Sequence, residues 1–296
     1  MLTFICCSLN DQLAFMLRKN IAQTIGNIEW EWCYIDNLRN NKGICQVYNQ
    51  AAANANGDIL CFVHEDVFFK TSGWGENLEL AFKETEKPGI IGIAGSRLII
   101  SPQAGWYNFT NPDLNRYNVI QNYQNGTKKK LYINPEKEKN SKVLLVDGVL
   151  MCMKKETWAE FPFNEQLLDG FHFYDIDISM RVSLKYNNYV TYAFEIEHLS
   201  EGSINNNWVK SFMLFDKGNK VKTICLDRIS KSDIINEKKF KLIHLIENFI
   251  KYDHPFSLFW EYLIRLLLID PIKAIRLALK SLKVCFKDKK IQSPLF

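Results

Sequence analysis

The hydrophobic pattern of residues 2–95 alternates between short continuous apolar runs and apolar positions at helical spacing. The runs at 2–7, 32–35, 59–63 and 90–94 predict buried strands. The helical spacing falls in the gaps between them, at Leu13, Met16, Leu17 and Ile21, at Ile44, Val47, Tyr48, Ala51, Ala52 and Ala55, and at Trp74, Leu78, Ala81 and Phe82. We expect Asp11 to cap the first helix. This alternation predicts an α/β fold with a mostly parallel, Rossmann-type sheet and helices on both faces.

Residues 101–141 break this pattern. They are rich in Asn, Pro and Lys, and they carry the aromatic residues Trp106, Tyr107, Phe109, Tyr117 and Tyr123. A loop of this length is usually a functional lid or is disordered, and the aromatic residues favour a lid. Strand patterns resume at 142–146, 149–153 and 189–194, and a helix is expected to begin near Tyr174.

From about residue 233 the pattern is helical and basic. We therefore expect one α/β domain over residues 1–230 and a C-terminal helical extension over 231–296. The extension holds 13 Lys and Arg against 7 Asp and Glu, so the net charge of +4 arises there and the first part is slightly acidic. With no nucleic-acid-binding motif and this acidic body, we expect no nucleic-acid partner.

The cysteine and hydropathy patterns indicate a cellular compartment. The eight cysteines contain no C-x-x-C pair, which argues against a zinc ribbon or a thioredoxin-type site. The longest apolar stretch, 256–269, contains Glu261 and Arg265, whereas a membrane-spanning helix needs ~20 residues with few charges. The N-terminus has no basic segment ahead of its apolar run. We expect a reducing, cytoplasmic location without a membrane span.

The end of the extension predicts an amphipathic helix that begins after the Asp270 cap, at Pro271. One stripe is apolar and the next is basic, formed by Ile272, Ile275, Leu279, Leu282 and Phe286 and by Lys273, Arg276, Lys280, Lys283 and Lys287. Two arrangements fit this pattern. The helix packs on the body with a solvated basic edge, or residues 271–296 make peripheral contact with an anionic membrane at its inner face.

Polar residues follow three of the predicted strands: Ser8-Leu9-Asn10, Asp36-Asn37 and His64-Glu65-Asp66. In open α/β sheets, ligands bind beyond the carboxyl ends of the strands. Carboxylates at such a position suit Mg²⁺ or Mn²⁺ bridging a diphosphate, and Asp36 is able to accept hydrogen bonds from a nucleobase or a ribose. The same residues also fit structures without a ligand, namely a solvated strand end at 64–66 and a turn at Asp36-Asn37.

The segment 170–177 places three aromatic residues and His172 before two carboxylates at a predicted helix start. Asp177 has Arg181 four residues later, the spacing of a helical ion pair, which leaves Asp175 free to act. The helix dipole is expected to keep the pKa of Asp175 low. Both acids are also common at helix starts without any chemistry. His198, after the last predicted strand, is a metal ligand or a structural histidine.

These motifs occur in the order found in family-2 glycosyltransferases of the GT-A fold, and the chain resembles the streptomycin-biosynthesis-type branch over about residues 1–225. The resemblance rests on residues 43–49 with the alanines 51–53, on 62–66 as a version of the D-x-D motif, on 146–148, on 171–177 and on His198. It departs from the common pattern at His64, where relatives carry an acid, and at Tyr174, where many carry Glu.

The resemblance implies a role for each site residue. Asp36 contacts the nucleotide base, on a donor side that also includes Ser8, Asn10, Asn49 and Glu65. Asp66 binds a divalent cation, Mn²⁺ or Mg²⁺, with His198 and His64. Asp175 is the general base, and the acceptor lies beside Asp147, Gly148, His172 and Tyr174.

The implied function is an inverting, metal-dependent hexosyltransferase that moves a sugar from a nucleotide-diphosphate sugar to a glycan or lipid-linked acceptor in cell-surface polysaccharide synthesis. The alternative is a catalytically impaired protein on the same fold that binds nucleotide sugars or carbohydrates, a reading motivated by His64. The presence of Asp66 and Asp175 argues against it. A sugar nucleotidyltransferase needs a glycine-rich loop after the first strand, and residues 8–11 contain no glycine.

Overall fold

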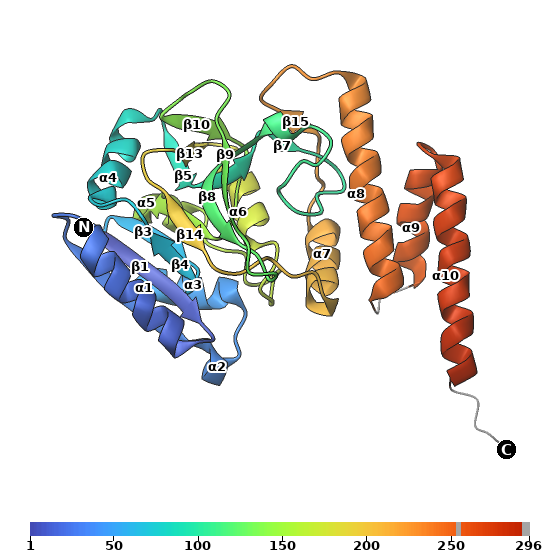
Figure 1. Ribbon diagram of the computed structural model, residues 1–296, viewed down its shortest axis with the longest axis horizontal. Coiled ribbons are helices and arrows are strands. Elements are labelled where there is room, and N and C mark those ends of the chain that lie inside the picture. Colours follow the sequence, from blue (N-terminus) through green and yellow to red (C-terminus); the bar gives the residue numbers. More distant parts are fainter. Residues whose placement is uncertain (253–255, 292–296) are drawn as a thin grey trace.

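A mixed seven-stranded sheet forms the centre of the computed structural model, which describes residues 1–252 and 256–291 (Figure 1). Its order is β10 (Asn140–Val143), β13 (Asn187–Thr191), β5 (Pro88–Gly92), β12 (Leu150–Lys154), β3 (Ile59–Val63), β1 (Leu2–Ser8) and β2 (Trp30–Asp36). Only β10 and β12 run against the other five strands. The sheet is therefore mostly parallel, as the sequence predicts.

Helices cover both faces of this sheet because alternate strand residues point to opposite sides. Phe4 of β1 packs in a core with α1 (Asp11–Thr24) and α4 (Trp74–Glu84). Its neighbour Ile5 packs in a second core with α3 (Ile44–Asn54) and α6 (Tyr174–Val182). The expected cap of α1 is off by one residue. Asn10, not Asp11, accepts from the Gln12 and Leu13 amides, since its extended backbone aims the side chain at them.

A second sheet crosses the carboxyl ends of the central strands. Its order is β11 (Leu145–Val146), β6 (Ala94–Ser96), β8 (Asn115–Asn122), β14 (Ile196–His198) and β4 (Val67–Phe69), with β9 (Lys128–Ile133) beside β8. The segment expected to be one long lid thus contains a β-hairpin, β8–β9. Some buried positions of β8 hold polar side chains, including Asn115 and Asn118. The strand therefore lacks the alternation of hydrophobic and polar residues by which a strand is predicted.

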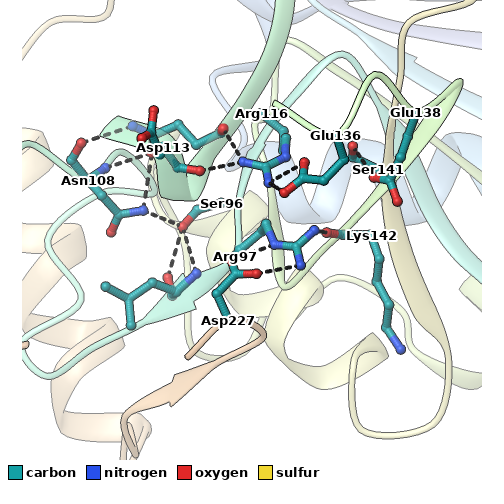
Figure 2. Close-up of polar contacts among 12 residues, drawn as sticks. Ser96, Arg97, Asn108, Asp113, Arg116, Glu136, Glu138, Ser141, Lys142 and Asp227 are labelled. Atoms are coloured by element: carbon teal, nitrogen blue, oxygen red, sulfur yellow. Dashed lines mark hydrogen bonds and ion pairs between the residues drawn. The ribbon is translucent and has the colours of Figure 1, made fainter. Parts of the chain in front are cut away.

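The irregular part of this segment, residues 100–111, is held by polar contacts (Figure 2). Asn108 donates to Ser96 Oγ at 2.7 Å and to Asn115 Oδ1 at 3.1 Å. Nearby, Arg97 binds both carboxylate oxygens of Asp227 at 2.7 Å, which fastens the short pair β7 (Leu98–Ile99) and β15 (Ile224–Cys225). Bidentate pairs of this kind fix geometry as well as adding energy. The loop therefore has a defined place beside the second sheet.

The remaining chain is largely helical: α7 (Asn206–Gly218), α8 (Lys231–Lys251), α9 (Phe256–Leu267) and α10 (Pro271–Ile291), with α2 (Asn37–Asn40), α5 (Lys155–Glu160) and the 3₁₀ turn Pro112–Leu114 earlier in the chain. The sequence indicates no helix at α7. Phe212 and Phe215 of α7 share one core with Leu245 and Phe249 of α8, so the core continues across the expected boundary at residue 230. None of the helices in the described residues is long and apolar enough to cross a bilayer.

Candidate functional site

His64, Asp66 and His198 come together where β3 ends and β14 pairs with β4. In this pairing His198 lies opposite Val67, the residue that follows Asp66 in the chain, so His198 lies close to Asp66. One ligand atom from each of the three residues lies within 4.8 Å of the others. Asp66 Oδ2 is 3.5 Å from His198 Nε2, and the Gln121 amide oxygen lies 3.1 Å from the other ring nitrogen of His198. The three predicted metal-binding residues therefore form one cluster.

The donor atoms of this cluster suit a divalent cation. The buried Nε2 of His198 reaches no hydrogen-bond partner within the described residues, as expected of a nitrogen aimed at a ligand. Burial lowers the pKa of His64, and His198 lowers it further. Burial opposes the ionisation of Asp66, but the imidazole of His198, 3.5 Å away, outweighs it and holds the Asp66 pKa below its usual value. A neutral imidazole and an ionised carboxylate are the forms that bind metals.

Tyr174 connects this cluster to the predicted acceptor side. Its buried hydroxyl lies 2.8 Å from His64 Nε2 and 3.2 Å from the Gly148 carbonyl oxygen. The carbonyl can only accept, so the hydroxyl donates to it and accepts from Nε2–H, which leaves the lone pair of His64 on Nδ1. A Cβ at Gly148 would meet the Tyr174 hydroxyl oxygen at 2.1 Å, and this close approach requires glycine.

Asp175 is half-buried beside Asp147 at the start of α6. One carboxylate oxygen accepts from the Gly148 amide at 3.2 Å. Burial raises the pKa of Asp175 to about 7, the charge of Asp147 adds to the rise, and the backbone amides oppose it. The expectation of a low pKa is therefore wrong, because the loss of water outweighs the helix dipole. The expected ion pair is present, with Arg181 Nε 2.8 Å from Asp177.

The donor-side residues lie at adjoining strand ends. Ser8 pairs with Asp36 across β1 and β2. The Glu65 carboxylate accepts from the Leu9 and Asn10 amides at 2.9 Å and from the Ser8 hydroxyl, so it holds the β1–α1 loop in place. Asp36 caps α2 and lies 3.0 Å from Arg39 Nε.

Asn49 is not brought to these residues. Its amide oxygen accepts from Trp158 Nε1 at 3.1 Å and from the Phe163 backbone at 2.9 Å, and its nitrogen donates to the Phe163 carbonyl at 2.8 Å. It borders a separate hollow with Trp158 and Pro162. The sequence could not show this, because both partner residues lie more than a hundred residues away along the chain.

A cavity of about 550 Å³ joins the cluster to the candidate base. His64, His198, Asp147, Asp175 and His172 line it, and the remaining wall is rich in aromatic residues, among them Trp106, Tyr107, Phe109, Tyr117, Phe171 and Trp208. His244 of α8 also lines it. In the sequence, His244 looks like an ordinary position of the helical pattern around residues 242–249. Its place in the cavity wall is seen only in the structure.

Helix α8 also anchors the aromatic loop to the cavity. The buried carboxylate of Glu237 accepts from the Thr110 amide and hydroxyl at 2.8 Å and from the Phe109 amide at 3.1 Å. Lys241 donates to the Gly105 carbonyl at 2.9 Å. Burial lowers the Lys241 pKa to about 8, and Glu237 limits the fall. The loop is thereby bound to α8.

Residues 3–228 match the model of the Glycosyltransferase like family. The chain therefore belongs to this family of sugar-transferring enzymes, and the match agrees with the GT-A-like α/β fold expected from the sequence. No curated protein matches the sequence.

The solved structures that match this chain include the following three. GalNAc-T7 with UDP, GalNAc and Mn²⁺ is 10% identical, with a TM-score of 0.47 over 73% of this chain and 47% of that one. Staphylococcus aureus TarS 1–349 with UDP-GlcNAc is 11% identical, with a TM-score of 0.43 over 90% and 71%. A197 from STIV is 12% identical, with a TM-score of 0.38 over 78% and 96%. This chain thus spans about half the length of GalNAc-T7.

Proposed function

We propose that this glycosyltransferase inverts the anomeric configuration of the sugar it transfers, with Asp175 as the general base. The observation that carries the proposal is the placement of Asp175 in the cavity that His64 and His198 of the metal cluster also line. A pKa raised to about 7 makes this carboxylate an effective base near neutral pH, because proton transfer works best when the pKa of the base is near the working pH.

The proposed reaction needs no covalent intermediate. Asp175 accepts the proton of the acceptor hydroxyl as its oxygen attacks the anomeric carbon from the face opposite the leaving group. The bond from that carbon to the diphosphate oxygen breaks, and the nucleoside diphosphate leaves. A divalent cation bound by Asp66, His198 and His64 would neutralise charge on the departing diphosphate. The two ring nitrogens favour Mn²⁺ over Mg²⁺, which prefers oxygen ligands.

Donor and acceptor are proposed to bind on either side of Tyr174. On the donor side, Asp36 and Ser8 receive the nucleoside and Glu65 shapes the loop that includes Asn10. On the acceptor side, Asp147, Gly148 and His172 face a cavity whose aromatic rings suit the apolar faces of a sugar. The donor is a nucleotide-diphosphate hexose. The acceptor is a glycan or a lipid-linked sugar, which fits cell-surface glycan synthesis from the cytoplasmic side.

Two sequence features bear on the branch of the family and on the alternative function. Residues 43–49 and 171–177 resemble the streptomycin-biosynthesis-type branch, and membership of that branch remains a prediction. His64 adds no negative charge to the cluster, which supports the alternative of a protein that binds nucleotide sugars without transferring them. The alternative predicts donor binding with no product.

The first experiment is a thermal-shift panel of nucleotide sugars with and without Mn²⁺. Because a ligand that binds the folded state raises its melting temperature, the true donor is expected to give the largest rise, and only with the metal. Asp66→Ala should abolish the metal-dependent part of the rise, and Asp58→Ala, at an exposed carboxylate, is the control. An equal rise in Asp66→Ala would refute the metal site. NMR of the product then shows whether the anomeric configuration is inverted.

A further inference from the structure

The outer sides of α9 and α10 carry large aliphatic side chains that the rest of the described chain does not cover. Leu268, just after α9, is 84% exposed and Ile272 of α10 is 65% exposed. Ile264, Leu267, Ile275, Leu279 and Leu282 are each exposed by 44% or more. Single exposed leucines are common, but a succession on two consecutive helices marks an interaction surface.

The exposed aliphatic residues differ from the residues by which the two helices pack on the body. Among the described side chains of α10 the buried positions are Ala274 and Leu277, and in α9 they include Leu263 and Leu266. The apolar stripe from Ile272 to Leu282 is therefore not what holds α10 to the body. The side chains of Phe286, Lys283 and Lys287, which continue the two predicted stripes, lie outside the described residues, as does the end of the predicted segment 271–296.

Basic residues lie along the same helix. The sequence of α10 contains seven Lys and Arg against one Asp. Lys273 is 3.8 Å from Glu247 of α8, whereas Arg276 and Lys280 are exposed and pair with no carboxylate among the described side chains. Arg276 and Lys280 each follow an exposed apolar residue, Ile275 and Leu279, and so lie ~100° from it around the helix.

We infer that this surface, Ile264, Leu267, Leu268, Ile272, Ile275 and Leu279 with the cations Arg276 and Lys280, docks on an anionic lipid bilayer. The aliphatic side chains enter the headgroup boundary while the cations contact lipid phosphates. Near an anionic leaflet each such cation contributes attraction that salt weakens. A second copy of the chain is the poorer occupant, because a symmetric contact would bring two strongly basic helices together.

Docking of this surface would hold the catalytic cavity near the lipid. Helix α8 lies between the α9–α10 pair and the body, and α1 lies at the opposite end of the molecule (Figure 1). The same α8 contributes His244 to the cavity wall. A cavity whose wall includes α8, the helix on which the α9–α10 pair packs, suits a lipid-linked acceptor, and this last step alone rests on the proposed function.

The test is co-sedimentation of the full-length chain with vesicles of phosphatidylcholine and of phosphatidylcholine mixed with phosphatidylglycerol. We expect binding to the anionic vesicles that falls as salt is added. Leu268→Ser with Ile272→Ser, and separately Arg276→Glu with Lys280→Glu, should each weaken binding by about tenfold or more. Because all four side chains are exposed, the variants should keep the wild-type melting temperature.

Two controls match these changes elsewhere on the surface. Leu184→Ser removes a leucine that is 80% exposed, and Arg18→Glu with Lys19→Glu makes the same charge change on α1. Both should bind vesicles like the wild type. Absence of binding, equal binding by all variants, or equal loss in the controls would overturn the inference. A dimer that Leu268→Ser with Ile272→Ser dissolves, without vesicle binding, would also overturn it and assign the surface to a second copy.

Discussion

The hydroxyl of Tyr174 lies 2.8 Å from Nε2 of His64, so the residue next to the candidate base directly contacts the candidate metal cluster. Partners of this kind fix the ring orientation and tautomer of a metal-binding histidine. The resemblance implies an acceptor-side role for Tyr174, at a position where many relatives carry Glu. Its position instead gives it a second task, which is to leave the Nδ1 lone pair of His64 available for a cation.

Removal of that hydroxyl should therefore weaken the metal site before it harms the fold. Tyr174→Phe is expected to lower Mn²⁺ affinity by roughly tenfold, the usual effect of losing such a partner. Calorimetric titration of Mn²⁺ in the presence of the nucleoside diphosphate measures this. Tyr186→Phe, at a hydroxyl that contacts Glu160 on the surface, is the control and should titrate like the wild type. Unchanged Mn²⁺ affinity in Tyr174→Phe would show that Tyr174 does not position His64.

The pH dependence of transfer should report the environment of Asp175. Its pKa is raised to about 7, and the base acts only when ionised, so kcat/KM should increase with pH through about 7 and then level off. Asp147→Asn removes a nearby negative charge that helps to raise this pKa. The rise in kcat/KM should then begin at lower pH. A pH profile that does not move in Asp147→Asn would contradict the coupling between the two carboxylates.

Glu237 offers a test of the loop anchor, because it is buried and accepts hydrogen bonds from Phe109 and Thr110. Glu237→Gln keeps the shape but loses the charge that faces the buried Lys241, and should destabilise the fold by about 1–3 kcal/mol. We expect a raised acceptor KM with little change in donor Kd. Glu247→Gln, on the same helix at a partly exposed site 3.8 Å from Lys273, is the control. Equal effects on acceptor and donor would argue against a loop-specific role.

The parts of the account that the sequence predicted are those set by local spacing. The alternation of apolar runs and helical periods identified the parallel sheet, and the i,i+4 spacing identified the Asp177–Arg181 pair, which forms at 2.8 Å. His64 and His198 were brought into one metal site only through resemblance to a known family, because 134 residues of chain separate them.

The parts that the sequence missed depend on packing between distant segments. From its position at a helix start, Asp175 was expected to have a low pKa, but burial raises the pKa instead. Asn49 was expected on the donor side, but its side-chain amide forms hydrogen bonds with Phe163 and Trp158 instead. Strand β8 carries buried polar residues such as Asn115, so its alternation is hidden until the partners are known.

The central claim is that Asp175 removes the proton from the acceptor, and one measurement tests it most directly. Single-turnover transfer is compared between wild type and Asp175→Asn with saturating donor, alongside donor Kd and melting temperature. The account predicts unchanged donor binding, an intact fold and transfer slower by roughly 10²-fold or more, since only the base is lost. Transfer at a near-normal rate in Asp175→Asn would contradict it.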